Sequence, residues 1–142
     1  MSRAFTKDRD DAPEPPLPAP ERTHPNYVTP RGLRLLRERR KAATEPREVE
    51  HFDRELDSAI VVHPPEEREE VAFGASVHVL GEKFDGTFSI VGDDEADIAS
   101  GKISFTSPLA AALMGARNGD RVIWHRPIGD MELRVTGITY DE

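Results

Sequence analysis

Residues 90–120 read IVGDDEADIASGKISFTSPLAAALMGARNGD, and this stretch decides the fold. Gly92 to Asp97 must interrupt the apolar run that ends at Val91, because Asp and Gly disfavour strands and favour turns. Residues 103–105 then alternate apolar and polar side chains, as a half-buried strand does. We therefore expect a strand, a turn that carries an acidic run, and a second strand.

A short capped helix follows the second strand. The Ser107 hydroxyl can cap a free backbone N–H, and Pro108 at the first helical position loses no donor that the helix needs. Residues 109–114 are good helix formers, and Gly115 suits the left-handed conformation that ends many helices. The composition and periodicity of this region predict a small antiparallel sheet with one helix.

Several short motifs, in this order and at this spacing, resemble the C-terminal domain of the Gre family (GreA and GreB) of bacterial transcription elongation factors. The runs that carry the resemblance are Ile90–Asp97, Gly101–Ser104, Ser107–Ala110, Ala112–Gly115 and Gly119–Asp120. The resemblance implies an α+β, FKBP-like fold, in which a strongly bent antiparallel sheet embraces one short helix. It also implies docking onto RNA polymerase at the rim of the secondary channel.

Composition limits the other function classes. The net charge of −8 argues against general nucleic-acid binding, which favours a basic surface, and we expect no direct specific DNA binding. The chain has no cysteine, which excludes disulfides, thiolate zinc sites and thiol nucleophiles. No apolar run approaches the roughly 20 residues of a membrane span, and the first residues lack an apolar signal core. We expect a soluble, cytoplasmic monomer.

The sequence divides into three parts. Residues 1–26 are rich in proline and charge and predict a disordered tail, although the PxxP spacing leaves a proline-rich ligand as an alternative. Residues 27–63 predict a short antiparallel helical hairpin, and residues 64–142 predict the Gre-type domain. Within that domain we expect strands over 71–80, 84–91, 122–124 and 133–138, and a core that includes Val77, Ile90, Phe105, Leu109, Leu113 and Trp124.

The hairpin is predicted from caps and spacing. Thr29 is the expected N-cap of a first helix that starts at Pro30 and stops before Pro46, and a second helix is expected from about Arg47 to Val61. The inward positions, at spacings of three and four, are Leu33, Leu36, Arg40, Ala43, Val49, Phe52, Leu56 and Ala59.

Charge separates the two arms, since the first is basic and the second acidic. We favour salt bridges between the arms, and contact of the basic arm with nucleic acid or an acidic protein surface is the alternative. The charged residues are Arg31, Arg34, Arg37, Arg39, Arg40 and Lys41 in the first arm and Glu45, Glu48, Glu50, Asp53, Glu55 and Asp57 in the second.

We expect no catalytic residue, cofactor or bound metal. The histidines lack metal-ligand spacing, the serines lie in no nucleophile motif, and no glycine-rich phosphate loop is present. The acidic run at residues 93–97 lacks the calcium-loop pattern. It is either a solvated hairpin turn or part of the polymerase-docking face.

The hairpin departs from the cleavage-stimulating members of the family. In those factors a long hairpin enters the channel, and an acidic pair at its tip helps to hold the catalytic Mg²⁺ that activates water. An arm of residues 29–44 spans roughly 24 Å, which is about half the length of the family's long arm. If the globular domain docks at the usual place, the tip should therefore fall roughly 20 Å short of that metal. Glu45 and Glu48 lie near the expected tip, but their context does not match the family's tip motif. The chain resembles the short-armed, Rnk-type members instead.

The resemblance and the short hairpin therefore imply a polymerase-binding regulator that docks at the secondary channel, modulates elongation or competes with longer channel-binding factors, and does not stimulate cleavage. The docking candidates are Asp93, Asp94, Glu95, Asp97, Ser107 and Pro108, and the hairpin-tip candidates are Glu45 and Glu48. Two alternatives stay open: a cleavage-stimulating factor that uses Glu45 and Glu48, and a peptidyl-prolyl isomerase suggested by the FKBP-like fold.

Overall fold

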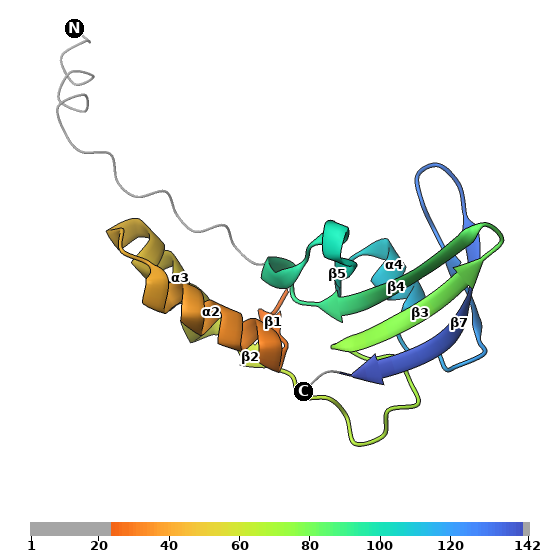
Figure 1. Ribbon diagram of the computed structural model, residues 1–142, viewed down its shortest axis with the longest axis horizontal. Helices are drawn as coiled ribbons and strands as arrows, with labels where there is room; N and C mark the ends of the chain where they lie inside the picture. Colours follow the sequence, from red (N-terminus) through yellow and green to blue (C-terminus); the bar gives the residue numbers. More distant parts are fainter. Residues whose placement is uncertain (1–23, 141–142) are drawn as a thin grey trace, which may run out of the picture.

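The computed structural model describes residues 24–140, and Figure 1 shows two helices beside a curled sheet that holds one short helix. This arrangement confirms the predicted α+β class. Most of the predicted proline-rich tail, residues 1–23, lies outside the described residues, as do residues 141–142.

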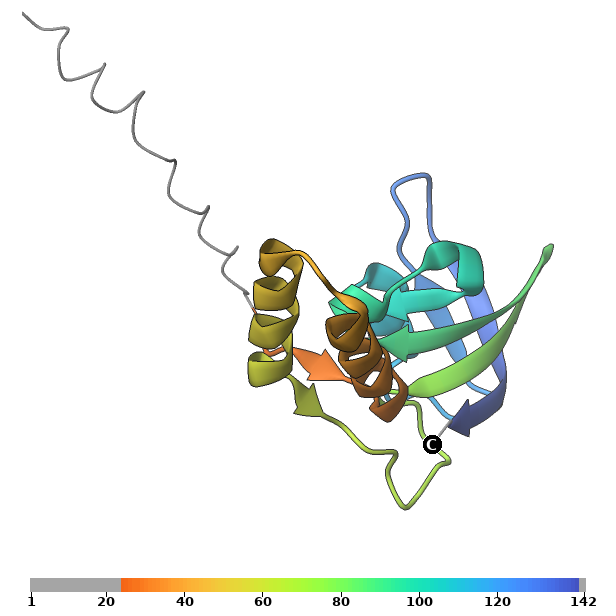
Figure 2. The same ribbon diagram turned by 60° about the vertical axis from the view of Figure 1, so that its left-hand side comes forward.

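The hairpin consists of α2 (Pro30–Ala42) and α3 (Pro46–Ser58), which lie next to one another and project from the sheet domain (Figures 1 and 2). The Thr29 side chain accepts a hydrogen bond from the Gly32 N–H, which confirms the predicted cap. The second helix ends at Ser58 rather than Val61. The cause is a short parallel pairing between β1 (Tyr27–Val28) and β2 (Ile60–Val61), which takes the end of the predicted helix into an extended conformation.

A buried asparagine closes the base of the hairpin. Asn26 is 5% exposed, and its Nδ2 donates to the Glu55 carbonyl at 3.2 Å and to Ser58 Oγ at 2.9 Å. The Asn26 carbonyl accepts from the Ile60 N–H at 2.8 Å. Asn26 thus donates to a carbonyl in the last turn of α3, which Ser58 Oγ also contacts, and it joins the two ends of the hairpin.

The main sheet has five strands in the order β5-β4-β3-β7-β6. The strands are β3 (Ala75–Gly81), β4 (Phe84–Val91), β5 (Lys102–Ser104), β6 (Arg121–Trp124) and β7 (Met131–Tyr140). Pairing is antiparallel except between β4 and β5, which run parallel. The acidic run between them is therefore not a hairpin turn. It forms the 3₁₀ turn η1 (Asp93–Glu95), and η2 (Ile98–Ser100) follows.

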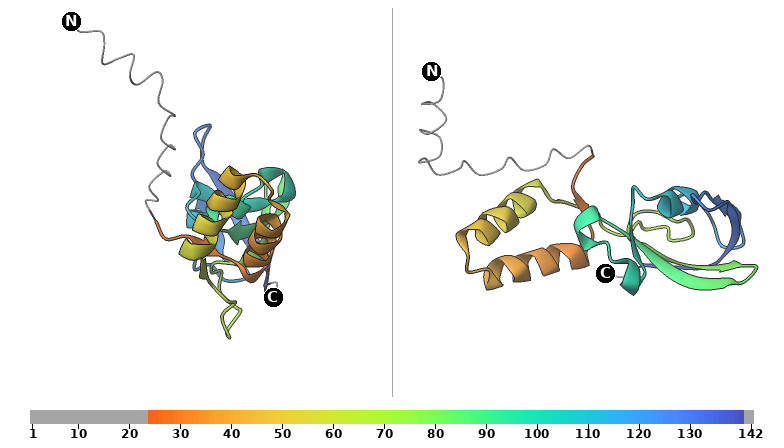
Figure 3. Two further views of the ribbon diagram at one scale, coloured as in Figure 1. Left: turned by 90° about the vertical axis from the view of Figure 1, so that its left-hand side faces the viewer. Right: turned by 90° about the horizontal axis from the view of Figure 1, so that it is seen from above.

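The core lies between the curled sheet and α4 (Pro108–Leu113), which Figure 3 shows at the sheet's inner side. Because side chains alternate between the two faces of a strand, Ala75, Val77 and Val79 of β3 all face the core. Ser107 caps this helix by accepting from the Ala110 N–H, as predicted. Four of the predicted core residues are buried, namely Val77, Ile90, Leu109 and Leu113, whereas Phe105 and Trp124 are partly buried at its margin.

The hairpin base should depend on Asn26. We expect Asn26→Ala to destabilise the hairpin by about 1–3 kcal/mol, because it removes the hydrogen bonds that the buried amide donates to α3. Faster hydrogen exchange of the α3 amides would report this loss, and Asn118→Ala, at an exposed turn, is the matched control. Unchanged exchange in α3 would show that the buried amide does not hold the helices together.

Candidate functional site

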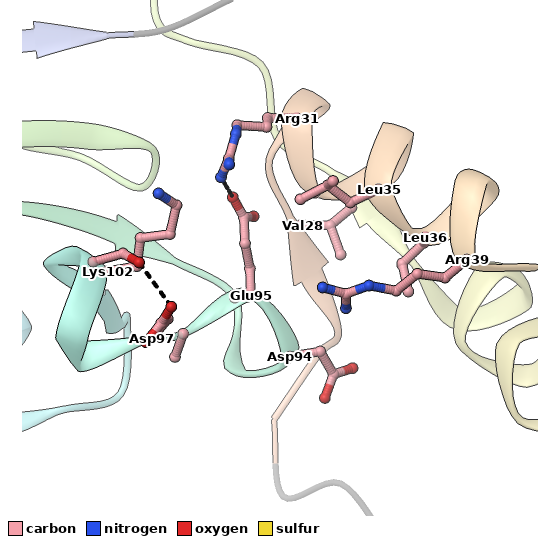
Figure 4. Close-up of a pocket in the computed structure, with 13 residues that line it drawn as sticks. Val28, Arg31, Leu35, Leu36, Arg39, Asp94, Glu95, Asp97 and Lys102 are labelled. Carbon is pink, nitrogen blue, oxygen red and sulfur yellow. Dashed lines mark hydrogen bonds and ion pairs between the residues drawn. The ribbon is translucent and has the colours of Figure 1, made fainter.

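The acidic run at residues 93–97 lies against the N-terminal end of α2. Figure 4 shows the Glu95 side chain reaching from this loop toward Arg31 on the helix. Segments more than sixty residues apart in the chain therefore meet here. We call this contact between η1 and the first turn of α2 the hairpin joint.

Glu95 makes the central contact of the joint. Its Oε1 accepts from Thr29 Oγ1 at 2.6 Å, and its Oε2 lies 3.4 Å from Arg31 Nη1. The Glu95 side chain is only 9% exposed, so solvent screens its contact with Thr29 weakly, whereas the Arg31 side chain is 44% exposed. The Thr29 hydroxyl both donates to the carboxylate and accepts from the Gly32 N–H at 2.9 Å, which links the helix cap directly to the loop.

Two glycines allow the close approach at the joint. A Cβ at Gly92 would lie 2.1 Å from the Tyr27 carbonyl oxygen, and a Cβ at Gly32 would lie 2.4 Å from Glu95 Oε1. Real Cβ contacts are not this short. At Gly92 a side chain would therefore push against the Tyr27 backbone, and at Gly32 it would displace the end of the Glu95 side chain.

Asp93 forms a second contact on the same loop. It accepts hydrogen bonds from Ser104 Oγ and from Thr106 Oγ1, and it contacts His24 Nε2. The Ser104 hydrogen bond is the main cause that holds the pKa of Asp93 below 3.8. His24 and Thr106 also lower it, while burial opposes them. The His24 ring also packs edge-on against Phe105, with centroids 5.1 Å apart.

A cleft of about 340 Å³ lies beside the joint, between α2 and the acidic run. Val28, Leu35 and Leu36 supply its apolar wall. Charged side chains of both signs line the rest, among them Arg39 and Asp94. The cleft therefore has no single sign of charge that would select a simple ion.

The predicted docking residues divide into two groups. Glu95 holds the joint, Asp93 contacts Ser104 at the end of β5, and the Ser107 hydroxyl caps α4. Asp94, Asp97 and Pro108 are exposed, although Asp97 also accepts a hydrogen bond from Ser100 Oγ at 2.7 Å. The exposed residues are accessible to a partner, whereas the side chains of Asp93, Glu95 and Ser107 make contacts within the chain.

The structure places Glu45 and Glu48 together at the far end of the hairpin. Glu45 is the N-cap residue of α3 but makes no side-chain capping bond, and Glu48 lies in the first turn. Both are exposed. Each helix has 13 residues, which corresponds to a length of about 20 Å.

The basic arm is less neutralised than the favoured interpretation predicts. Within residues 24–140, the ion pair between the helices is Arg40 Nε to Asp53 Oδ1 at 2.5 Å. Arg34, Arg37 and Lys41 are exposed and form no ion pair with another described residue. Their spacing of three and four places them along one side of α2, on the face opposite the buried Leu36. Salt bridging between the arms therefore explains few of these charges.

Three aromatic residues gather on the inner face of the sheet, away from the joint. Phe84 and Phe88 stack with centroids 5.9 Å apart, and Trp124 packs edge-on against both. Arg126 lies over the Trp124 ring at 5.5 Å from its centroid. These rings are largely in contact with one another.

Two kinds of feature are absent from the described part of the chain. From residue 24 to residue 140, no group of three or more His, Asp or Glu side chains is placed to hold a metal ion. In the same part of the chain, no helix is both long enough and apolar enough to cross a membrane.

The sequence does not reveal the hairpin joint. It indicates that Thr29 is a helix cap and that Glu95 belongs to an acidic run, but nothing in it pairs these two residues across more than sixty positions. One signal was available: the first turn of α2 has no acidic residue, although helix N-termini favour one. The structure supplies that acid from the loop.

Comparison with known proteins yields a family and several relatives. The family model for the C-terminal domain of the transcription elongation factors GreA and GreB matches residues 65–140. The chain is 40% identical over 97 residues to transcription elongation factor GreB of Neisseria meningitidis, which covers 66% of this chain and 60% of that protein. It is 44% identical over 72 residues to GreA of Pseudomonas aeruginosa, which covers 49% of this chain and 46% of that protein.

The matched part therefore spans 60% or less of the length of these two relatives. Among solved structures, a GreA/GreB elongation factor from Nitrosomonas europaea is similar with 24% identity and a TM-score of 0.47. That match covers 82% of this chain and 99% of the other.

The close approach at the joint should not tolerate a side chain at Gly92. We expect Gly92→Ala to lower the free energy of unfolding by about 1–3 kcal/mol, because the Tyr27 backbone must move. Gly137→Ala is the matched control, since its Cβ would meet His78 Cβ at an ordinary 3.7 Å. Denaturant unfolding measures both, and equal effects would contradict the crowding at Gly92.

The Asp93 carboxylate should make the stability of the folded chain depend on pH in the acid range. Because its pKa is lowered in the folded chain, its contribution is fully present above the unfolded value of 3.8 and is lost as pH falls through the folded pKa. Asp93→Asn should therefore lower the melting temperature at pH 6, and the difference from the parent should shrink below about pH 4. A difference that is constant across this range would contradict the assignment.

Proposed function

The chain belongs to the GreA/GreB C-terminal family, and on this premise we propose that it binds RNA polymerase at the entrance of the secondary channel and modulates elongation without stimulating transcript cleavage. One observation carries the proposal: a family-type domain over residues 65–140 is joined to a hairpin whose helices have only 13 residues each.

Length decides which part of the family's mechanism this chain can perform. A helix of about 20 Å is roughly half the length of the family's long arm, so the tip stops roughly 20 Å from the polymerase metal if the domain docks in the usual place. A carboxylate must lie within about 2 Å of Mg²⁺ to bind it. The chain then acts as a binding protein that supplies no group to the chemistry.

The docking surface is the exposed side of the loops that precede α4. Asp94, Asp97 and Pro108 are accessible there, beside the capped end of the helix at Ser107. Asp93 and Glu95 support this surface from within, because their carboxylates engage other segments of the chain. The exposed cations of α2 point away from the hairpin core and add a second surface for an acidic part of the polymerase.

Competition follows from a shared docking surface. A chain that occupies the channel entrance excludes a long-armed factor from the same place, and this exclusion needs no contact with the metal. A cleavage-stimulating factor is the alternative, since Glu45 and Glu48 are both exposed at the tip. The isomerase alternative is less favoured, because the inner-face aromatic rings pack on one another.

A competition assay tests the proposal. Backtracked elongation complexes are mixed with a long-armed Gre factor and increasing amounts of this chain, and RNA cleavage is followed. We expect inhibition that rises with concentration and is weakened at least several-fold by the double substitution of Asp97→Asn and Pro108→Ala.

Substitution of both tip glutamates is the matched control. Glu45→Gln with Glu48→Gln should inhibit as well as the parent, because the tip makes no required contact. If the parent stimulates cleavage when no long-armed factor is present, and this variant does not, the chain is a cleavage-stimulating factor instead. Unchanged cleavage together with no binding to polymerase would contradict the proposed partner.

A further inference from the structure

We propose that Glu95 is a positioning residue, whose carboxylate at the N-terminal end of α2 sets the direction in which the hairpin leaves the sheet domain. The buried side chain contacts both Thr29 and Arg31, so it holds the helix at its cap and at its first turn. These are contacts to the helix itself rather than to the chain that precedes it.

The charge suits this position. A helix N-terminus carries a partial positive charge, and α2 has no acidic residue in its own first turn. Glu95 supplies the missing negative charge from the loop, and Arg31 adds a second cation beside it. A neutral side chain at residue 95 would lose both attractions even where its shape is preserved.

Apolar contacts at the base of the hairpin fix its location but leave its direction open. Tyr27 packs edge-on against Phe73 and Phe105, with centroids 6.0 and 5.4 Å apart, and this anchors the chain before the helix begins. Rotation about the backbone of residues 28 and 29 would swing α2 around that anchor. A second point of contact on the helix removes this freedom, and Glu95 provides it.

Small changes at the joint have large effects at the tip. For a helix of about 20 Å, a tilt of about 10° displaces the far end by about 3 Å. This inference rests on the proposed function in one respect: when the sheet domain docks, a fixed joint aims the hairpin into the channel, and a loose joint does not.

Distance measurement on the free chain tests the joint without polymerase. The chain has no cysteine, so Thr44→Cys in the hairpin loop and Thr139→Cys on β7, both exposed, accept spin labels at two known places. We expect one narrow distance distribution for the labelled parent and a clearly broader one with Glu95→Ala. Glu95→Gln, which keeps an acceptor for Thr29, should broaden it less.

Glu82→Gln is the charge-matched control, because Glu82 is exposed in the turn between β3 and β4, away from the joint. It should leave the distribution narrow. Circular dichroism confirms that each variant keeps its helices. A distribution that stays narrow in Glu95→Ala, or one that is already broad in the parent, would overturn the positioning role.

The same variants separate this inference from the proposed function. If the parent binds polymerase, Glu95→Ala should need a several-fold higher concentration to inhibit cleavage by the long-armed factor, while Glu82→Gln should behave as the parent. A joint that loosens in the free Glu95→Ala chain, with no polymerase binding by the parent, would support the positioning role and overturn the proposed function. Polymerase binding by the parent, together with an unaltered distance distribution in Glu95→Ala, would support the proposed function and overturn the positioning role.

Discussion

The direction of the hairpin depends on one carboxylate placed at the N-terminal end of α2. Glu95 accepts from Thr29 Oγ1 at 2.6 Å and lies 3.4 Å from Arg31, in a position that leaves its side chain 9% exposed. Without this contact, the hairpin would be tied to the sheet domain by the residues that precede α2, namely His24 and Tyr27, and by the linker after β2. The acidic loop is therefore part of the connection between the two halves as well as the proposed docking surface.

The hairpin is stabilised mainly at its base. Helices of 13 residues are marginal alone, and α3 has no buried residue along its length. The buried amide of Asn26 and the two-residue pairing of β1 with β2 close the open end of the hairpin, where Leu36 is also buried. Contacts at the base can therefore hold a short arm whose helices bury little of their own length.

Local signals predicted most of the elements, and long-range contacts explain what they missed. The caps at Thr29 and Ser107 and the core positions Val77 and Leu113 follow from chemistry within a few residues. The parallel pairing of β4 with β5 and the contact of Glu95 with α2 join segments that local patterns do not relate. The sequence therefore indicates the acidic run, but it does not show that Glu95 turns from the surface to contact α2.

A structure of this chain bound to a stalled elongation complex, determined by electron cryo-microscopy, tests the central claim most directly. We expect the sheet domain at the rim of the secondary channel, with Pro108 and Asp97 in the interface and the hairpin pointing inward. The tip glutamates should stop roughly 20 Å from the catalytic metal. Glu45 or Glu48 within about 2 Å of that metal, or a chain bound elsewhere on the polymerase, would contradict the account.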